Sequence, residues 1–488
     1  MSSFRIRALT CAGLAVGAAL LLLSRGEATS AGAAELSTRA RPLRTSLPAA
    51  SGATLVAELG CAGCHAGVGS SNDARAKAPA LDDVGARRSP GFLFAYLANP
   101  TRIRTDLGRT RMPDFHLDER ERLALTLYLG TLRASGGAPS AAPPAAAVGD
   151  AERLDAAYER VRTAHPEVTA AIGERIFVAL NCAGCHAQRS VAPWRSGPDL
   201  STEGSRVKPE WLRAFLATPH AVRPFGAQPG TGSRMPDFHL TPDEVDSLTA
   251  YLRARRATLP SYAARPLSVF ARHEVESLLR EKLPCLGCHQ LGDEGGRIGP
   301  DLSNVRDRLR PAYIHAMITD PRHTTPGTIM PKTPMPSRTI ELVAAYLITR
   351  APTPSAPAYL SLVDNPPRPP SRPADNERTA TALYRHICAN CHGASGDGDG
   401  WNARYLPVRP TAHASAAYMS TRPDGTIYDG IAAGGLILGR SNRMPAFGEM
   451  LSRTEIHSLV AYIRTLCDCQ GPAWSRDGVG AAAGSGAR

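Results

Sequence analysis

The chain has 488 residues, of which 43% are hydrophobic and only 6% aromatic, and it carries a formal net charge of +12 at pH 7. This length allows three or four domains of ordinary size, and the scarcity of aromatic residues favours small modules whose centres are filled by something else. The basic residues are scattered and lack interleaved aromatic residues, which argues against a nucleic-acid-binding protein.

The N-terminus is typical of an export signal. Arg5 and Arg7 precede an uncharged run over residues 8–23, and small residues follow from Ala28 to Ala34. The run is short for a membrane-spanning helix, which needs about 20 apolar residues. We expect residues 1–34 to be a signal peptide or a membrane anchor. The protein would then lie in the periplasm or at the outer face of the cytoplasmic membrane, with residues 35–50 as a linker.

One short motif occurs four times in the rest of the chain. Eight of the eleven cysteines form C-x-x-C pairs, and a histidine directly follows each pair. C-x-x-C-H is the attachment signature of c-type haem: two thiols at i and i+3 bond to one porphyrin, and the histidine ligates its iron. Zinc binding is disfavoured because zinc ribbons bring their second pair within about 15–20 residues. The four motifs are Cys61/Cys64/His65, Cys182/Cys185/His186, Cys285/Cys288/His289 and Cys388/Cys391/His392.

A heptapeptide, RMPDFHL, occurs at residues 111–117 and again at residues 234–240. Its methionines, Met112 and Met235, follow the histidines of the first and second motifs by 47 and 49 residues. Methionine is a common second ligand of histidine-ligated haem iron. We therefore expect each of these two methionines to complete the site of the motif that precedes it. His116 and His239, in the same heptapeptides, are alternative ligands.

The other two motifs are followed by methionine–proline steps as well. Met444 follows the fourth motif, whereas the third motif offers both Met330 and Met335. Met330 precedes Tyr346 by 16 residues, the spacing by which Met112 and Met235 precede their own tyrosines, whereas Met335 precedes it by only 11. We therefore assign Met330 as the iron ligand and keep Met335 as the alternative.

Helical patterns flank each motif, so that the chain divides into repeated units. Apolar residues recur at helical spacing before each motif, and a second periodic stretch with a capping-type start follows each methionine. A middle helix that stops at proline is shared by the first three units, whereas the fourth has a glycine-rich stretch instead. The expected domains, here called units one to four, are residues 51–135, 151–257, 258–350 and 375–469. A linker would occupy residues 136–150, and a Pro-rich, extended spacer would occupy residues 351–374. A disordered tail would follow over residues 470–488.

This pattern resembles the class I c-type cytochromes, which are small all-α domains around one haem with His and Met on the iron. The resemblance covers everything but the leader, the linkers and the tail. It implies an all-α fold with four cytochrome c-like domains in tandem and four covalently bound haem c groups. In that family a proline carbonyl holds the ring of the iron-bound histidine; Pro79, Pro198 and Pro300 match that position, and Pro407 is a vaguer match in unit four. Unit four looks most like the haem domains fused to or serving haem–copper oxidases.

The expected function is an exported tetrahaem cytochrome that transfers electrons between respiratory or dehydrogenase partners, with no catalytic residues. Iron with two protein ligands leaves no open site for a substrate. One alternative is a cytochrome subunit of a dehydrogenase or oxidase complex. Another is a haem peroxidase-like enzyme with one open iron, for which unit three is the first candidate. The expected partners are an electron-donating complex and a terminal acceptor, without nucleic acid, and membrane contact would come only through the N-terminal segment.

Two further groups of residues have open roles. Arg111, Arg234 and Arg443 directly precede ligand methionines and are candidates to pair with haem propionates. Cys467 and Cys469 are outside the motifs. They could form a C-x-C disulfide, bond to another chain, or remain surface thiols without function.

Overall fold

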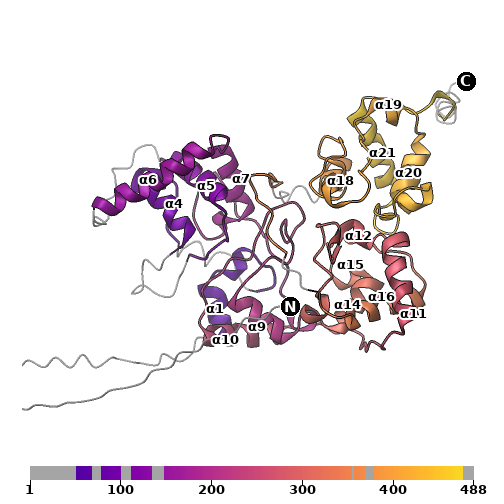
Figure 1. Ribbon diagram of the computed structural model, residues 1–488, viewed down its shortest axis with the longest axis horizontal. Helices are drawn as coiled ribbons and strands as arrows, with labels where there is room; N and C mark the ends of the chain where they lie inside the picture. Colours follow the sequence, from indigo (N-terminus) through magenta and orange to yellow (C-terminus); the bar gives the residue numbers. More distant parts are fainter. Residues whose placement is uncertain are drawn as a thin grey trace, which may run out of the picture. The chain divides into compact units, whose positions relative to one another are not determined.

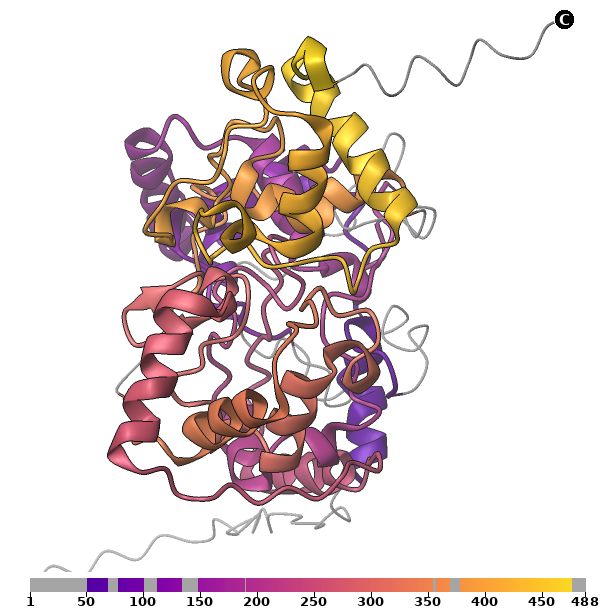
Figure 2. The ribbon, with the colours of Figure 1, turned by 90° about the vertical axis from the view of Figure 1, so that its right-hand side faces the viewer.

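The computed structural model describes residues 51–68, 78–100, 112–133, 148–188, 190–353, 357–368 and 378–475. The expected leader and linker up to residue 50, most of the linker over 136–150 and the tail beyond residue 475 lie outside these ranges. Figures 1 and 2 show helices joined by long irregular segments. In the described part the one sheet is a hairpin of β1 (Gln290–Leu291) and β2 (Glu294–Gly295). The expected all-α fold class is confirmed.

No helix within the described ranges is both long and apolar enough to cross a membrane.

Unit three is built from one continuous stretch of chain. Its first helix packs on its last helix, and its middle helix packs on the last helix as well. The middle helix begins with Pro311, whose fixed φ suits the first helical position. The elements in chain order are α11 (Val269–Ser277), the π-helix η3 (Leu278–Lys282), α12 (Cys285–Cys288), α13 (Val305–Arg308), α14 (Pro311–Thr319), α15 (Pro321–Thr324) and α16 (Ser337–Thr349).

Units one and two exchange the helices that directly precede their motifs. Helix α1 (Gly52–Glu58) packs on α10 (Pro242–Arg253) of unit two, and α7 (Ala170–Ala179) packs on α5 (Glu119–Thr131) of unit one (Figure 1). A glycine permits the second crossing, because a Cβ on Gly173 would collide with the carbonyl oxygen of Ala124. In the described residues, the units expected over residues 51–135 and 151–257 are therefore not separate bodies, because each body contains the helix that precedes the other unit's motif. The physical reason lies in the repeat: both bodies have the same pattern of elements, so that either can receive a helix of this kind.

The bodies of units one and two consist of short helices around these crossings. In unit one α4 packs on α5 and also on α6, which comes from unit two, and in unit two α9 packs on α10. Each body's last helix starts with a capping box, formed by Asp118 with Glu121 and by Thr241 with Glu244. The remaining elements are η1 (Cys61–Gly63), α3 (Val84–Arg87), α4 (Pro90–Ala98), α6 (Val148–Ala164), η2 (Cys182–Gly184), α8 (Glu203–Arg206) and α9 (Pro209–Ala217).

Unit four is again built from one continuous stretch. Its first helix, α17, and the helix in its glycine-rich segment, α20, both pack on its last helix, α21. Its core surrounds Tyr384, which is fully buried. The elements are α17 (Ala380–Leu383), the π-helix η5 (Tyr384–Cys388), α18 (Ala389–His392), η6 (Ala403–Tyr405), α19 (Ala416–Met419), α20 (Asp424–Ala433), η7 (Gly435–Leu438), α21 (Arg453–Cys467) and η8 (Ala473–Ser475).

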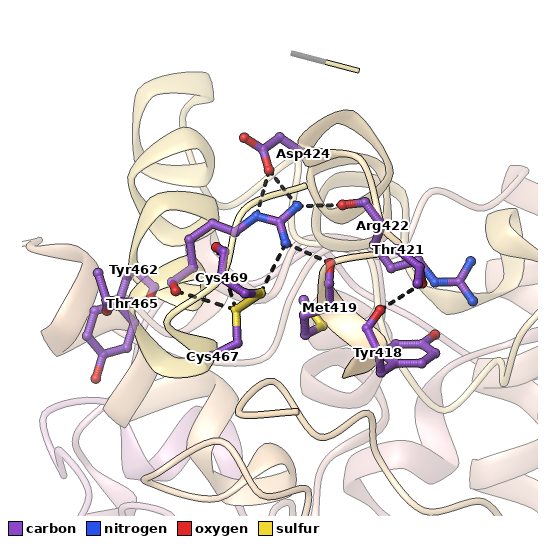
Figure 3. Close-up of a disulfide and its surroundings, with 10 residues drawn as sticks. Tyr418, Met419, Thr421, Arg422, Asp424, Tyr462, Thr465, Cys467 and Cys469 are labelled. Carbon is purple, nitrogen blue, oxygen red and sulfur yellow. Dashed lines mark hydrogen bonds and ion pairs between the residues drawn. A yellow bond between two sulfur atoms is a disulfide. The ribbon is translucent and has the colours of Figure 1, made fainter. Parts of the chain in front are cut away.

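A disulfide between Cys467 and Cys469 lies at the end of α21 (Figure 3). Beside it the Arg464 guanidinium binds Asp424 at 2.7 Å and the carbonyl oxygen of Met419 at 2.7 Å. Of the three alternatives for these cysteines, the structure has the intrachain bond. The bond closes the turn at the C-terminal end of α21.

The Pro-rich segment is not a free spacer where the structure describes it. Leu362 is 1% exposed and belongs to the hydrophobic core around units one and two. Two backbone N–H groups of this segment donate to unit two, from Leu360 to the Pro224 carbonyl at 3.0 Å and from Arg368 to the Gly230 carbonyl at 2.8 Å. The expected extended spacer is thus corrected for residues 357–368, because Leu362, just before the proline run, is buried in a hydrophobic core.

Candidate haem sites

The site of unit three shows the basic arrangement. The His289 Nδ1–H group donates to the Pro300 carbonyl oxygen at 2.8 Å, which leaves Nε2 with its lone pair free. Two backbone bonds hold the same turn: Gly299 N–H to Cys288 O at 2.7 Å and Leu302 N–H to Gln290 O at 2.9 Å. Burial lowers the pKa of His289 to about 4. The ring is therefore neutral at pH 7, which is the form that ligates iron.

The first two sites have the same bonds, but the partners come from different units. His65 Nδ1–H donates to the Pro198 carbonyl at 2.9 Å, and His186 Nδ1–H donates to the Pro79 carbonyl at 2.9 Å. Pro79 and Pro198 thus hold ligand rings, each for the motif of the other unit. The pairing within each unit that the resemblance implied is corrected, for the reason given for the exchanged helices.

Backbone bonds repeat this exchange next to each ring. Gly197 N–H donates to Cys64 O at 2.9 Å, as Gly299 donates to Cys288 O in unit three. Leu200 N–H donates to Ala66 O at 3.1 Å, and Leu81 N–H donates to Ala187 O at 3.0 Å. Each acceptor lies in a haem motif or directly after it, so the whole loop around each histidine is exchanged.

The fourth site differs in its carbonyl. His392 Nδ1–H donates to the Thr411 carbonyl oxygen at 2.9 Å, so the vaguer match to Pro407 is wrong. His413 stacks on the His392 ring at a centroid distance of 4.1 Å, and its Nδ1 lies 3.0 Å from the Tyr384 hydroxyl. Burial lowers the pKa of His413 well below its ordinary range. Sequence reasoning missed Thr411 and the nearby His413, because it searched for a proline and the chain uses a threonine carbonyl here.

A single cavity of about 2970 Å³ adjoins the first three motifs. Small-molecule sites usually measure about 300–1,000 Å³, so this cavity has room for several such ligands. The eight motif cysteines are free thiols. Thiols, neutral imidazoles and thioethers on one cavity wall form the donor set that covalent haem requires, and the residues present fit that group. The candidate methionines on this wall are Met112, Met235, Met330 and Met335.

Arginine side chains line the same cavity between the first and third motifs. Val207 and Leu309 form an antiparallel bridge, which brings their neighbours Arg206 and Arg308 together. Nε of Arg206 and Nη2 of Arg308 are buried without a hydrogen-bond partner among the described residues. Burial, and then repulsion by neighbouring guanidinium groups, lowers the pKa of Arg308 to about 10, and Arg223 has the same value for the same reasons. Arg206 also forms an ion pair with Glu203. Buried guanidinium N–H groups that lack a partner fit the propionate groups of haem.

The arginines chosen from the sequence behave differently. Arg234 binds both carboxylate oxygens of Glu121, at 2.7 and 2.8 Å, with the two side chains 2% and 0% exposed. It therefore has a protein partner rather than a propionate. Arg443 donates to the Leu279 carbonyl beside the third motif at 3.3 Å, and Arg111 lies outside the described residues. The sequence did not single out the cavity arginines, because they lie outside the motifs in the chain and reach the cavity only when the chain folds.

The two RMPDFHL loops lie against each other. Asp114 and Asp237 exchange backbone hydrogen bonds of 2.8 and 2.7 Å. The exposed residues His116 and His239 adopt left-handed φ values of 53° and 50°, and their N–H groups bond to the carboxylates of these aspartates. The histidines are thus turn residues on the surface, and the alternative that they ligate iron is not supported. One reason for the repeat is that each copy forms the same turn.

The two methionines of unit three occupy different positions relative to helix α16. Met335 directly precedes the N-cap residue Pro336 and packs on the hydrophobic core. Leu117 and Leu240 hold this same position before α5 and α10, and both pack on cores as well. A hydrophobic residue before the N-cap commonly fixes the entry of the chain into a helix. Met330 lies five residues earlier, as Met112 and Met235 do before their own leucines.

Asparagines join the motifs in pairs. Asn181 Nδ2 donates to the Gly63 carbonyl at 2.9 Å and lies 3.5 Å from Cys64 Sγ. Asn402 Nδ2 donates to the Gly287 carbonyl at 3.0 Å and lies 3.3 Å from Cys391 Sγ. The first motif therefore contacts the second, and the third contacts the fourth. Sequence reasoning missed both asparagines because each acts on a motif more than 100 residues away.

Comparison with known proteins finds cytochrome c domains in the chain. The family model "Cytochrome c" matches residues 49–133 and 170–255, and the model "Cytochrome C oxidase, cbb3-type, subunit III" matches residues 375–463. These matches support a multi-domain c-type cytochrome. Its cytochrome c domains imply covalently bound haem c with iron and a role in electron transfer. No curated protein matches this cytochrome.

One solved structure is similar over part of the cytochrome. It is a chain of the Kuenenia stuttgartiensis reducing HAO-like protein complex, with 18% sequence identity over 44% of this chain and 100% of its own length. The TM-score is 0.16, so this likeness carries no structural argument.

Proposed function

We infer that this cytochrome is an exported tetrahaem electron carrier. One haem c is bonded to the cysteines of each motif, and each iron has one histidine and one methionine as ligands. The ligands are His65, His186, His289 and His392 with Met112, Met235, Met330 and Met444. When bound, each haem takes up and releases one electron at its iron.

The contact between motifs is the observation that carries this proposal. Because each haem is bonded to its motif, the Asn181–Gly63 bond places the first and second haems close together. The Asn402–Gly287 bond does the same for the third and fourth haems. The arginines that line the cavity between the first and third motifs connect the two pairs. Clustered redox centres suit a protein that passes electrons along itself.

The protein groups perform the positioning. Carbonyl oxygens fix the tautomer and the orientation of all four ligand histidines, at 2.8–2.9 Å. The position of Met335 before the α16 N-cap supports Met330 as the ligand in unit three. The cavity arginines favour the anionic propionates and thereby hold each porphyrin in place.

Redox partner proteins are the proposed donor and acceptor. The match of unit four to an oxidase subunit model supports a partner of that class for this unit. The formal charge of +12 favours acidic partner surfaces, although propionates reduce it in the loaded protein. The export-type N-terminus supports a location in the periplasm or at the outer face of the membrane.

The test is a haem-to-protein ratio measured together with carbon monoxide binding to the reduced protein. The proposal predicts a ratio of four and a spectrum that carbon monoxide leaves unchanged, because all four irons hold two protein ligands. A ratio clearly below four contradicts the tetrahaem assignment. A spectral change equal to one haem contradicts full His/Met ligation and favours a ligand-binding or enzymatic iron.

A further inference from the structure

We propose that units one and two also exchange their iron-ligating methionines, which rests on the His/Met ligation proposed above. The haem attached to Cys61 and Cys64 takes Met235 as its second ligand. The haem attached to Cys182 and Cys185 takes Met112. The order of the sequence would pair each methionine with the motif before it, so the structure assigns these two ligands the other way round.

Side-chain packing is the first observation behind this assignment. Met112 packs on the hydrophobic core that contains Phe177 and Leu180, just before the second motif, and Cys182 packs on the same core. Met235, like Cys61, packs on a core that contains Leu55 and Leu59, just before the first motif. That core extends to Cys285 of unit three but does not include Cys182. Each methionine thus shares a core with the helix and the first cysteine of the other unit's motif.

The carbonyl exchange is the second observation, and it is independent of the methionines. In unit three the carbonyl donor Pro300, the candidate ligand Met330 and the last helix α16 follow one another on a single body. In units one and two the body that supplies Pro198 to His65 also carries Met235 and α10, on which α1 packs. The whole body therefore packs around the motif of the other unit, and we assign its methionine to the iron of that motif.

The contact between the two RMPDFHL loops holds the exchanged bodies together. The backbone bridge of Asp114 with Asp237 lies two residues after each methionine. Arg234, directly before Met235, reaches Glu121 in the other body through two short bonds. Displacing either methionine loop would break this buried ion pair. The loops therefore hold the two methionine-bearing bodies together.

One consequence concerns the order of assembly. Unit one can attach a haem at Cys61 and Cys64 as soon as it is made, but its second ligand lies 170 residues later in the chain. Neither unit one nor unit two can complete a His/Met site alone. The two sites must therefore be completed together.

The experiment counts the haems that bind carbon monoxide in reduced full-length variants. In a chain with Cys61→Ser and Cys64→Ser, which carries three haems, Met235 has no iron to ligate under the proposal. Adding Met235→Ala should then leave carbon monoxide binding at zero, whereas adding Met112→Ala should open one haem per chain. The reverse result, one open haem with Met235→Ala and none with Met112→Ala, overturns the exchange.

Two controls separate this proposal from the ligation on which it rests. Met112→Ala and Met235→Ala, each alone in the four-haem chain, should open one haem per chain. If neither opens a haem, the methionines are not ligands and the proposed His/Met carrier itself fails. The mirror background, Cys182→Ser with Cys185→Ser, should give the opposite pattern to the first.

A second design keeps all four attachments, in case removal of a haem prevents folding. Under the exchange, His65→Gly and Met235→Ala act on one iron, and that double variant should show one carbon monoxide-binding haem. His65→Gly with Met112→Ala acts on two irons and should show two. Two haems in the first double variant and one in the second would overturn the proposal.

Discussion

Unit three and the pair formed by units one and two contain the same haem-site bonds with different chain connections. In unit three, His289, Pro300 and the helices α11 and α16 all come from one stretch. In the pair, the corresponding histidine and carbonyl are 133 residues apart for His65 and 107 residues apart for His186. The local geometry is the same, so the haem site depends on which surfaces meet and not on their order in the chain.

The difference shows what repetition does to a folding chain. Two bodies with the same RMPDFHL loop and the same pattern of elements can each receive a helix of this kind, and exchange of equivalent elements is a low-cost rearrangement. Unit three lacks such a twin, because its loop contains two methionine–proline steps and a different sequence. The contacts that distinguish the exchanged state are therefore outside the haem sites, in the loops and in the segment over residues 357–368.

The largest expected effect comes from the buried ion pair between the exchanged bodies. Glu121→Gln leaves the Arg234 guanidinium buried with a neutral partner, and loss of one member of a buried pair costs about 3–5 kcal/mol. We expect that loss in the free energy of unfolding, measured by denaturant titration. The matched control is Glu294→Gln in unit three, whose ion pair with Arg280 is more than half exposed and is worth about 0.2–1 kcal/mol. Equal losses would show that this pair does not stabilise the contact between the two bodies.

The next effect concerns the crossing of α7 on α5. Gly173→Ala places a Cβ against the Ala124 carbonyl oxygen, and overpacking of this kind costs about 1–3 kcal/mol. Gly130→Ala is the control on α5, since its Cβ would meet nothing within 4 Å and removing a helical glycine stabilises by about 0.5–1 kcal/mol. Thermal unfolding of the two variants should therefore move in opposite directions. A Gly173→Ala protein as stable as the parent would mean that α7 does not pack on α5.

The smallest effect is pH-dependent and belongs to unit four, which is continuous like unit three. Arg378, just before α17, hydrogen-bonds Glu455 at the start of α21 and lowers the pKa of that carboxyl group from 4.5 to about 2. Because the pKa is lowered by folding, this pair stabilises the protein above about pH 4.5, and the contribution is lost as the pH falls towards 2.

Arg378→Gln should remove this stabilisation. The pair is partly exposed, so we expect a loss below about 1 kcal/mol at pH 7. The difference from the parent should disappear by about pH 2, as measured by denaturant titration at several pH values. Arg453→Gln, an exposed position on the first turn of the same helix, should leave the pH profile unchanged. A difference that persists at pH 2 would show that Arg378 acts through packing rather than through charge.

Local chemistry made much of this protein predictable from its sequence. The C-x-x-C-H motifs depend on the spacing of adjacent residues, and the helices around them depend on apolar periodicity and capping residues such as Asp118 and Thr241. The assignment of Met330 over Met335 came from its distance to the last helix, and the N-cap position of Pro336 supports it. Each of these inferences uses residues that are neighbours in the chain or on one helix.

Only the tertiary structure decided which of several equivalent partners meet. The sequence contains two bodies of the same pattern and cannot say which of them receives the first helix and motif of unit one. That choice shows in long-range contacts such as His65 with Pro198 and α1 with α10. The same holds for Arg206 and Arg308, since a backbone bridge between two units brings them into one cavity. Periodicity and motif spacing describe each element separately, whereas the free energy that selects a pairing arises from burial and charge compensation between distant segments.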